Sequence, residues 1–257
     1  MTFVQTARIA WGIAKRSLML IPRVPSTFFP SLVMPLFLTV TFAGAFSGLT
    51  LIPGFPAEKA IDWFIPMTVI QGSAFAGVTI GLGAARDLES GFYDRLLLSP
   101  APRVALIAGP LLAAVMRSTF PLTLLLITAF LADANLPGGP LGIVTLATAS
   151  LSIGLIGGAW SLGLSLRFKT MQAAPLMQMG VFLTVFLSTA QMPLHLISGW
   201  LHNVARVNPM TNVLALAREG FLGEVTWAGT WPGLVSLAGI AAAVVLFAAR
   251  GMQKISP

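Results

Sequence analysis

Long runs of apolar residues alternate with short polar connections along the chain. Each run is close to the ~20 residues that a helix needs to cross a hydrocarbon core of ~30 Å. The runs lack the strict alternation of apolar and polar residues that marks barrel strands, so they predict helices. We expect an all-α, integral membrane six-helix bundle that forms one domain over residues 1–257. The six expected spans are Ser31–Leu51, Phe64–Ala84, Val104–Leu131, Leu141–Leu166, Ala173–Ala190 and Pro232–Ala249.

The composition agrees with a membrane protein. Hydrophobic residues make up 56% of the chain and charged residues 9%, whereas soluble domains carry about a quarter charged residues. Cysteine is absent, which excludes disulfides, thiolate chemistry and cysteine-ligated metals. The net charge of +7 comes from basic residues scattered between the apolar runs. That distribution favours a membrane topology over binding to nucleic acid.

The basic residues also predict the orientation, because Lys and Arg collect in cytoplasmic loops. If the amino terminus is inside, Lys59, Arg206 and Arg218 fall outside, and Arg117 lies within the third span. We therefore expect both termini to be cytoplasmic. The other basic residues then all lie on the cytoplasmic side: Arg8, Lys15, Arg16, Arg23, Arg86, Arg95, Arg103, Arg167, Lys169, Arg250 and Lys254.

Residues 1–26 predict an interfacial helix and a linker rather than a cleaved signal peptide. The basic region continues to Arg23, and no small-residue cleavage site follows a short apolar core. From Phe3 to Leu18 one helical face is apolar and the other carries polar and basic side chains. Such a helix either anchors the topology or also contacts a cytoplasmic partner. Pro22, Pro25 and Pro30 then break the helix before the first span.

A charged segment, "ARDLESGFYDRLLLSPAPR" (residues 85–103), separates the second and third spans. Leu88, Phe92 and Leu96 recur every four residues and form an apolar stripe between polar positions. Gly91 interrupts its middle, and prolines end it. The segment predicts a short amphipathic helix on the cytoplasmic face, although a plain polar connection is an alternative.

Three stretches resemble the type-2 ABC exporter permeases, in particular the daunorubicin-resistance-like branch. Residues 85–103 are similar to that family's loop after the second span, with an acidic residue, a "GxxDR" core and a "P-x-x-R" tail. "WFIPMTVIQG" (63–72) is similar to the opening of the second span, and "NPMTNVLALAREGFLG" (208–223) to the segment before the last span. Met67 stands where many members have glycine, and "LLLSP" is less basic than many members' versions.

The resemblance implies a permease that pairs with a second copy of itself and with two copies of an ABC ATP-binding subunit. Residues 85–103 would then be the coupling helix that docks into this ATPase. ATP and Mg would bind to the partner, because the chain has no Gly-Lys dipeptide and so no phosphate-binding loop of the GxxxxGK[ST] type. We expect this chain to bind no cofactor and to have no enzymatic activity of its own. The residues expected to couple to the ATPase are Arg86, Asp87, Glu89, Gly91, Phe92, Asp94, Arg95 and Arg103.

Residues 193–230, between the fifth and sixth spans, predict two amphipathic helices too short to cross the membrane. In the resembled family this region is an extracellular re-entrant hairpin, and residues 231–257 follow as span six and a cytoplasmic tail. His195 and His202 are seven residues apart. We do not expect a metal site there, because no carboxylate or third histidine is near in sequence.

Arg117 is expected to face protein or a wet cavity, because a charge in mid-bilayer costs at least ~2.5 kcal/mol. It is interpreted as either a structural hydrogen-bond anchor or a substrate contact, with Gln71 and Gln178 as possible partners. The resembled family places its first, second and fifth spans around a cavity between the two permeases. The residues expected to line that cavity are Phe42, Phe46, Gln71, Phe75, Arg117, Gln178, Phe182 and Phe186.

The resemblance implies a permease of the bacterial plasma membrane that exports a hydrophobic or amphipathic compound. A lipid or lipid-linked glycan is an alternative cargo within the same class. A secondary transporter is a different class, but the expected spans contain no Asp or Glu to couple protons. An intramembrane enzyme is a third class, and the chain has no concentrated catalytic set.

Overall fold

A computed structural model describes residues 3–23, 28–98 and 101–255. Pro25 and Pro100, two expected helix breakers, lie outside these residues. The described residues form α-helices joined by short turns and three 3₁₀ turns. The 3₁₀ turns are η1 (Ser47–Leu51), η2 (Met171–Ala173) and η3 (Leu194–Leu196). The α-helices are α1 (Phe3–Met19), α3 (Pro30–Ala45), α4 (Ala60–Glu89), α5 (Phe92–Leu97), α6 (Arg103–Leu131), α7 (Gly139–Phe168), α8 (Ala174–Phe186), α9 (Trp200–Val207), α10 (Pro209–Leu222) and α11 (Trp227–Ile255).

Within the described residues, four helices, α4, α6, α7 and α11, are long and apolar enough to cross a membrane. The expected first and fifth spans are also helical, but α3 has 16 residues and α8 has 13, fewer than the ~20 of a typical span. The first expected span is divided, because α3 ends at Ala45 and η1 continues the run. The helical membrane bundle is therefore confirmed, while the count of six spans stays a prediction.

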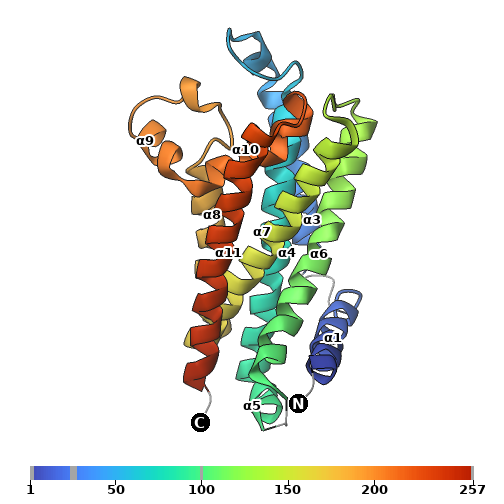
Figure 1. Cartoon of the computed structure of the whole chain (residues 1–257), viewed down its shortest axis with the longest axis vertical. Coiled ribbons are helices and arrows are strands. Elements are labelled where there is room, and N and C mark those ends of the chain that lie inside the picture. Colours follow the sequence, from blue (N-terminus) through green and yellow to red (C-terminus); the bar gives the residue numbers. More distant parts are fainter. Residues whose placement is uncertain (1–2, 24–27, 99–100, 256–257) are drawn as a thin grey trace.

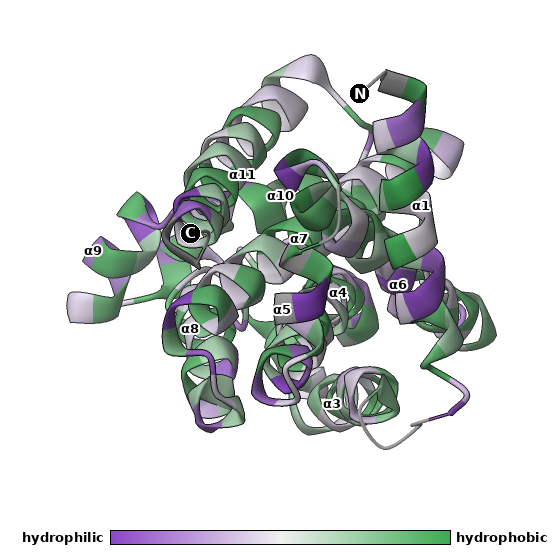
Figure 2. Cartoon of the chain, turned by 90° about the horizontal axis from the view of Figure 1, so that it is seen from below, coloured by the Kyte–Doolittle hydropathy of each residue, from purple (hydrophilic) through white to green (hydrophobic). Residues whose placement is uncertain are grey.

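Helix α4 is the centre of the bundle. Its most apolar stretch of 18 residues is 89% buried within the chain, whereas the corresponding stretch of α11 is 17% buried. Seen from below, α4 and α7 lie between α1, α3, α6, α8 and α11 (Figure 2). An outer helix such as α11 therefore exposes its apolar surface to lipid, whereas α4 packs against other helices of the chain.

Small residues bring α4 and α7 together. A Cβ on Gly77 would lie 2.2 Å from the carbonyl oxygen of Gly154, and one on Gly81 would lie 2.4 Å from Ser161. The Ser73 and Ser150 hydroxyls hydrogen-bond across the same seam at 2.7 Å. The GxxxG spacings of α4 and α7 thus serve packing within one chain.

The two ends of the bundle carry different elements (Figure 1). Helix α5, the start of α1 and the end of α11 lie at the lower end, and α9, α10 and the connection from α3 to α4 lie at the upper end. This arrangement places the beginning and the end of the described chain at the same end as the expected coupling segment. The expected orientation makes that end cytoplasmic.

Helix α1 packs along the lower half of α6 (Figure 1). The contact is close, because a Cβ on Gly109 of α6 would lie 2.7 Å from Cβ of Ile13 and 2.8 Å from the carbonyl oxygen of Ala10. Val4 and Trp11, which belong to the expected apolar face, are 58% and 49% exposed. The helix is confirmed, and these two side chains are free to contact lipid.

Candidate functional site

The expected coupling segment consists of three parts rather than one helix. Residues 85–89 are the last turn of α4, Ser90 and Gly91 form a turn, and α5 follows from Phe92 to Leu97. Gly91 has φ +69°, a left-handed backbone conformation that glycine adopts without steric cost. Arg103 begins α6. We call residues 86–97 the α4–α5 turn.

Arg16 of α1 binds this turn at two points. Its guanidinium donates to both carboxylate oxygens of Asp87, at 2.7 and 2.9 Å. The same group lies 4.1 Å from the centroid of the Phe92 ring, a cation–π distance. One side chain of the amino-terminal helix therefore holds the end of α4 and the beginning of α5.

Glu89 binds the turn to the connection between α7 and α8. Its Oε1 accepts hydrogen bonds from the Thr170 hydroxyl at 2.9 Å and from the backbone N–H of Met171 at 2.7 Å. The sequence predicted that Asp87 and Glu89 act at the ATPase contact. In the structure both carboxylates have partners within the chain, and they connect the turn to α1 and to η2.

Tyr93 seats α5 on the bundle. Its side chain is 4% exposed and belongs to a small apolar cluster with Leu106 of α6, Leu162 and Leu166 of α7, and Met252 of α11. Burial raises the pKa of its hydroxyl, so the phenol stays protonated and can donate a hydrogen bond. A displacement of α5 would therefore reach three further helices through apolar contacts.

Three of the expected coupling residues are exposed basic side chains: Arg86, Arg95 and Arg103. They lie on the end of α4, on α5 and at the start of α6. The side chain of Asp94, a fourth expected residue, lies outside the described part of the chain. The exposed charge described at this turn is therefore mainly positive, which suits an acidic partner surface.

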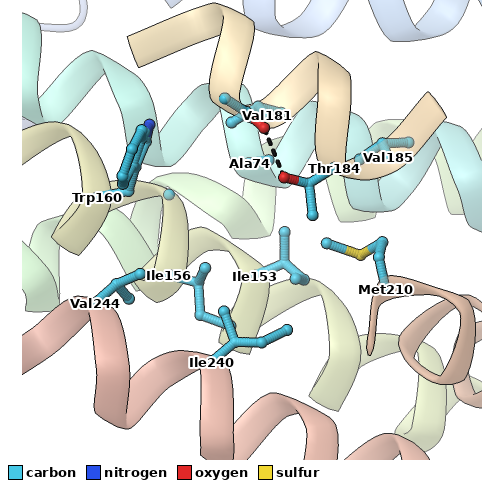
Figure 3. A pocket seen from close by; sticks show the side chains of 12 residues that line it. Ala74, Ile153, Ile156, Trp160, Val181, Thr184, Val185, Met210, Ile240 and Val244 are labelled. Atoms are coloured by element: carbon cyan, nitrogen blue, oxygen red, sulfur yellow. Dashed lines mark hydrogen bonds between the residues drawn. The ribbon is translucent and has the colours of Figure 1, made fainter. Parts of the chain in front are cut away.

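An apolar pocket of about 270 Å³ lies at mid-height between α8 and α11. Ile153, Ile156 and Trp160 of α7 form its back wall, and Met210 of α10 closes one end (Figure 3). Val244 of α11 faces α8 across the space (Figure 3). The lining is almost wholly hydrocarbon, which is suited to an apolar molecule or acyl chain.

Trp160 fixes one end of this pocket. Its indole N–H donates to the carbonyl oxygen of Met177 at 3.2 Å, and its ring stacks on Phe247 of α11 at 5.6 Å between centroids. A Cβ on Gly180 of α8 would lie 2.7 Å from the indole nitrogen, so glycine permits this approach. Trp160 thereby spaces α8 and α11, which flank the pocket.

The eight residues expected to line a cavity are dispersed. Phe42 of α3 and Phe46, directly after α3, pack around Phe64, with ring centroids 5.4 and 5.7 Å from it. Phe75 of α4 contacts Phe182 at 5.0 Å. Gln178, Phe182 and Phe186 line a shallow groove of about 420 Å³ on the free face of α8, and none of the eight lines the apolar pocket.

Gln71 is 1% exposed in the centre of α4. Neither atom of its side-chain amide has a hydrogen-bond partner among the residues that the structure describes. Burial without a partner costs ~1–3 kcal/mol for such a group. Gln71 is thus a buried polar group of α4 without a hydrogen-bond partner among the described residues.

Arg117 has other partners than the two glutamines that the sequence suggested. Its side chain is 6% exposed and donates to the Thr79 hydroxyl at 2.6 Å and to the carbonyl and hydroxyl oxygens of Ser17. Ser17 lies in the last turn of α1, where carbonyl groups carry partial negative charge. The pairing with Gln71 or Gln178 was wrong, and Arg117 joins α6 to α1 and α4.

Arg218 is buried and hydrogen-bonded, which the sequence did not predict. It was assigned to the outer side by charge alone, yet its side chain is 2% exposed. Its guanidinium donates to the carbonyl oxygens of Trp63 at 3.1 Å, Thr189 at 2.7 Å and Ala190 at 2.5 Å. The group also lies 3.6 Å from the centroid of the Trp63 ring. Arg218 therefore fastens α10 to the beginning of α4 and to the connection after α8.

The two histidines lie in this upper region and bond to backbone. His195 Nε2 is 3.0 Å from the carbonyl oxygen of Gly54, and His202 Nδ1 is 3.1 Å from that of Leu194. Among the residues that the structure describes, no group of three or more His, Asp or Glu side chains is placed to hold a metal.

Comparison with known proteins gives the family. A family model described as ABC-2 type transporter matches residues 10–222. The daunorubicin resistance ABC transporter permease protein DrrB1 of Streptomyces coeruleorubidus is 24% identical over 246 residues, which are 93% of this chain and 82% of that protein. The probable multidrug ABC transporter permease YbhR of Escherichia coli K12 is 27% identical over 183 residues, which are 67% of this chain and 48% of that protein.

A third relative extends the same pattern. The putative transport permease ycf38 of Porphyra purpurea is 24% identical over 206 residues, which are 78% of this chain and 69% of that protein. The family model includes most of α1, the whole α4–α5 turn and α10. The chain belongs to the ABC-2 type transporter family, as its three sequence motifs indicated.

Proposed function

We propose that the chain is the membrane permease of an ATP-driven exporter of the bacterial plasma membrane. Its ATPase is a separate ABC subunit, present in two copies that carry ATP and Mg, and a second copy of the chain completes the transporter. The family supports this proposal, as do the relatives whose names describe drug-resistance and multidrug permeases. The chain itself catalyses no reaction.

The observation that carries the proposal is the set of contacts around the α4–α5 turn. Asp87 is bound to α1, Glu89 to η2, and Tyr93 to α6, α7 and α11. A partner that pushes on α5 would therefore move several helices together. The exposed Arg86, Arg95 and Arg103 offer this partner a basic surface, so the ATPase groove should be acidic.

The cargo in this proposal is hydrophobic or amphipathic. The apolar pocket between α8 and α11 can hold hydrocarbon, and the groove on α8 that carries Phe182 and Phe186 adds apolar surface nearby. A second copy docked against α8 would enclose Gln178, Phe182 and Phe186 in the cavity predicted from the sequence, whereas Gln71 is buried within one chain. Closure of the ATPase would then rock the two bundles and release the cargo on the outer side.

Reconstitution tests the proposal. The chain is co-expressed with ABC ATP-binding subunits of the same genome, and the complex is purified and placed in lipid. We expect one of these subunits to co-purify, and its ATP hydrolysis to rise when a hydrophobic compound is added. Co-purification should fall when Arg86, Arg95 and Arg103 are replaced together by glutamine. Transport by the chain alone, driven by an ion gradient, would overturn the proposal.

A further inference from the structure

A second cavity, of about 430 Å³, lies at the lower end of the bundle, between α1, α4, α5 and α6. It is separate from the apolar pocket and shares no lining residue with it. The polar side chains that line it include Arg16, Arg86, Asp87, Tyr93 and Arg117. The expected orientation places this cavity at the level of the cytoplasmic leaflet.

The charge of the cavity is positive. Among the lining residues that the structure describes, Asp87 is the one acidic residue, and both of its oxygens are bound by Arg16. Among the side chains that the structure describes, no carboxylate lies within ion-pairing distance of Arg86 or Arg117. Two cationic side chains at this cavity therefore lack a carboxylate partner among the described residues, and an anion would be attracted to them.

Two buried hydrogen-bonding atoms of the lining have no partner among the described residues. They are the hydroxyl of Tyr93, whose side chain is 4% exposed, and Nε of Arg117, whose side chain is 6% exposed. Buried polar atoms are almost always hydrogen-bonded in folded proteins. Because Nε is an N–H donor and the phenol can donate its proton, both suit an acceptor such as a phosphate oxygen.

Apolar side chains form the rest of the wall. The cavity is also lined by Ile13 of α1, Leu20 directly after α1, Leu82 of α4, Leu96 of α5 and Leu106 of α6. An inorganic anion would leave this hydrocarbon surface without a counterpart. A molecule with a phosphate at one end and an acyl chain at the other would satisfy both parts of the lining.

We propose that this cavity binds an anionic phospholipid of the cytoplasmic leaflet, with the phosphate between Arg86, Arg117 and the Tyr93 hydroxyl and the acyl chain along the apolar wall. Such a lipid contacts α1 and the α4–α5 turn at once, so it acts as a bound structural lipid beside the coupling contact. The proposal goes beyond the export function, because this lipid is retained and is not the cargo.

Lipid binding to the purified chain in detergent tests this proposal independently of transport. Native mass spectrometry compares phosphatidylglycerol with phosphatidylcholine of the same acyl chains. We expect phosphatidylglycerol to bind more tightly. Arg86→Gln should weaken that binding about fivefold, since one basic residue near a membrane surface contributes about this factor. Tyr93→Phe should weaken it by a similar factor while leaving the size of the residue unchanged.

Arg8→Gln is the matched control, because Arg8 is exposed on α1 and does not line the cavity. It should change phosphatidylglycerol binding less than twofold. Inorganic phosphate, compared with chloride at the same ionic strength, separates a lipid site from a free-phosphate site. Equal binding of the two lipids, an equal loss in Arg8→Gln and Arg86→Gln, or tight binding of inorganic phosphate without competition from the lipid would each overturn the proposal.

Discussion

Arg16 and Asp87 form a bidentate ion pair, with N–O distances of 2.7 and 2.9 Å, between residues 71 positions apart in the chain. The pair joins the amino-terminal helix to the last turn of α4, directly before the turn at Gly91. Its side chains are 44% and 24% exposed, so solvent screens the attraction and its share of stability is below ~1 kcal/mol. The role of the pair is therefore to fix the position of the α4–α5 turn against α1 rather than to stabilise the fold.

Arg16→Gln should reduce the coupling of ATP hydrolysis to transport without loss of the folded complex. The α4–α5 turn would lose its contact with α1 but would keep those of Glu89 and Tyr93. The measurement is the ratio of cargo moved to ATP hydrolysed in proteoliposomes, together with the melting temperature. We expect a clear fall in that ratio and a small change in melting temperature.

Lys59→Gln is the control for this prediction. It breaks the other described ion pair, Lys59 with Asp133 at 2.7 Å, at the opposite end of the bundle. The ratio of transport to hydrolysis should be unchanged in this variant. An equal fall in both variants would mean that the position of the Arg16 pair is irrelevant to coupling.

Arg218→Leu should destabilise the protein strongly. The change leaves the carbonyl oxygens of Trp63, Thr189 and Ala190 buried without their donor. Loss of hydrogen bonds from a charged donor costs ~1.5–3 kcal/mol each, so the total loss should exceed ~3 kcal/mol. The temperature at which half of the detergent-solubilised protein aggregates gives the readout.

Arg206→Leu is matched to it, because Arg206 is exposed on the neighbouring α9. This variant should melt within a few degrees of the unchanged protein. If both variants melted alike, the hydrogen bonds of Arg218 would contribute little to stability.

Hydropathy predicted the helices well but not all of their ends. An apolar run as long as α4, α6, α7 or α11 is expected to form a helix in a membrane, because the backbone must satisfy its own hydrogen bonds. The segment 85–103 was harder to assign, since the last turn of α4 continues to Glu89 before the chain reverses at Gly91. The sequence indicated a break at Gly91. It did not indicate that the residues before this break continue α4 as far as Glu89.

The partners of the buried arginines could not be read from sequence. Arg218 binds backbone carbonyls 28, 29 and 155 positions away, and every residue carries such a carbonyl. Arg117 was recognised as exceptional because it interrupts an apolar run, but its partner Ser17 is 100 positions away. The coupling residues were predicted from a local motif. The apolar pocket instead combines residues of α4, α7, α8, α10 and α11 that resemble their neighbours in type.

Gly77→Ala should loosen the contact between α4 and α7. The new Cβ would lie 2.2 Å from the carbonyl oxygen of Gly154, so one of the two helices must shift. Overpacking of this kind costs ~1–3 kcal/mol, which a lower melting temperature would report. Gly239→Ala on α11 is the control, because nothing lies within 4 Å of its Cβ position. Equal melting temperatures for the two variants would contradict the close packing.

Val244→Phe should obstruct the apolar pocket between α8 and α11. The larger ring would occupy part of a space of about 270 Å³, so transport of an apolar compound should fall by roughly tenfold, equivalent to ~1.4 kcal/mol. Val235→Phe changes the same residue type on the same helix, at a position that is 62% exposed and outside the pocket. Its transport should stay normal. Full transport by Val244→Phe would mean that the cargo does not pass through this pocket.

Transport in inside-out membrane vesicles is the most direct test of an ATP-driven permease. The vesicles contain the chain with its co-purifying ATPase, and uptake of a hydrophobic fluorescent compound is followed after ATP is added. A second preparation carries the ATPase with its Walker A lysine replaced by alanine. We expect ATP-dependent uptake in the first preparation and none in the second. Uptake that persists in the second preparation and follows an ion gradient would contradict this expectation.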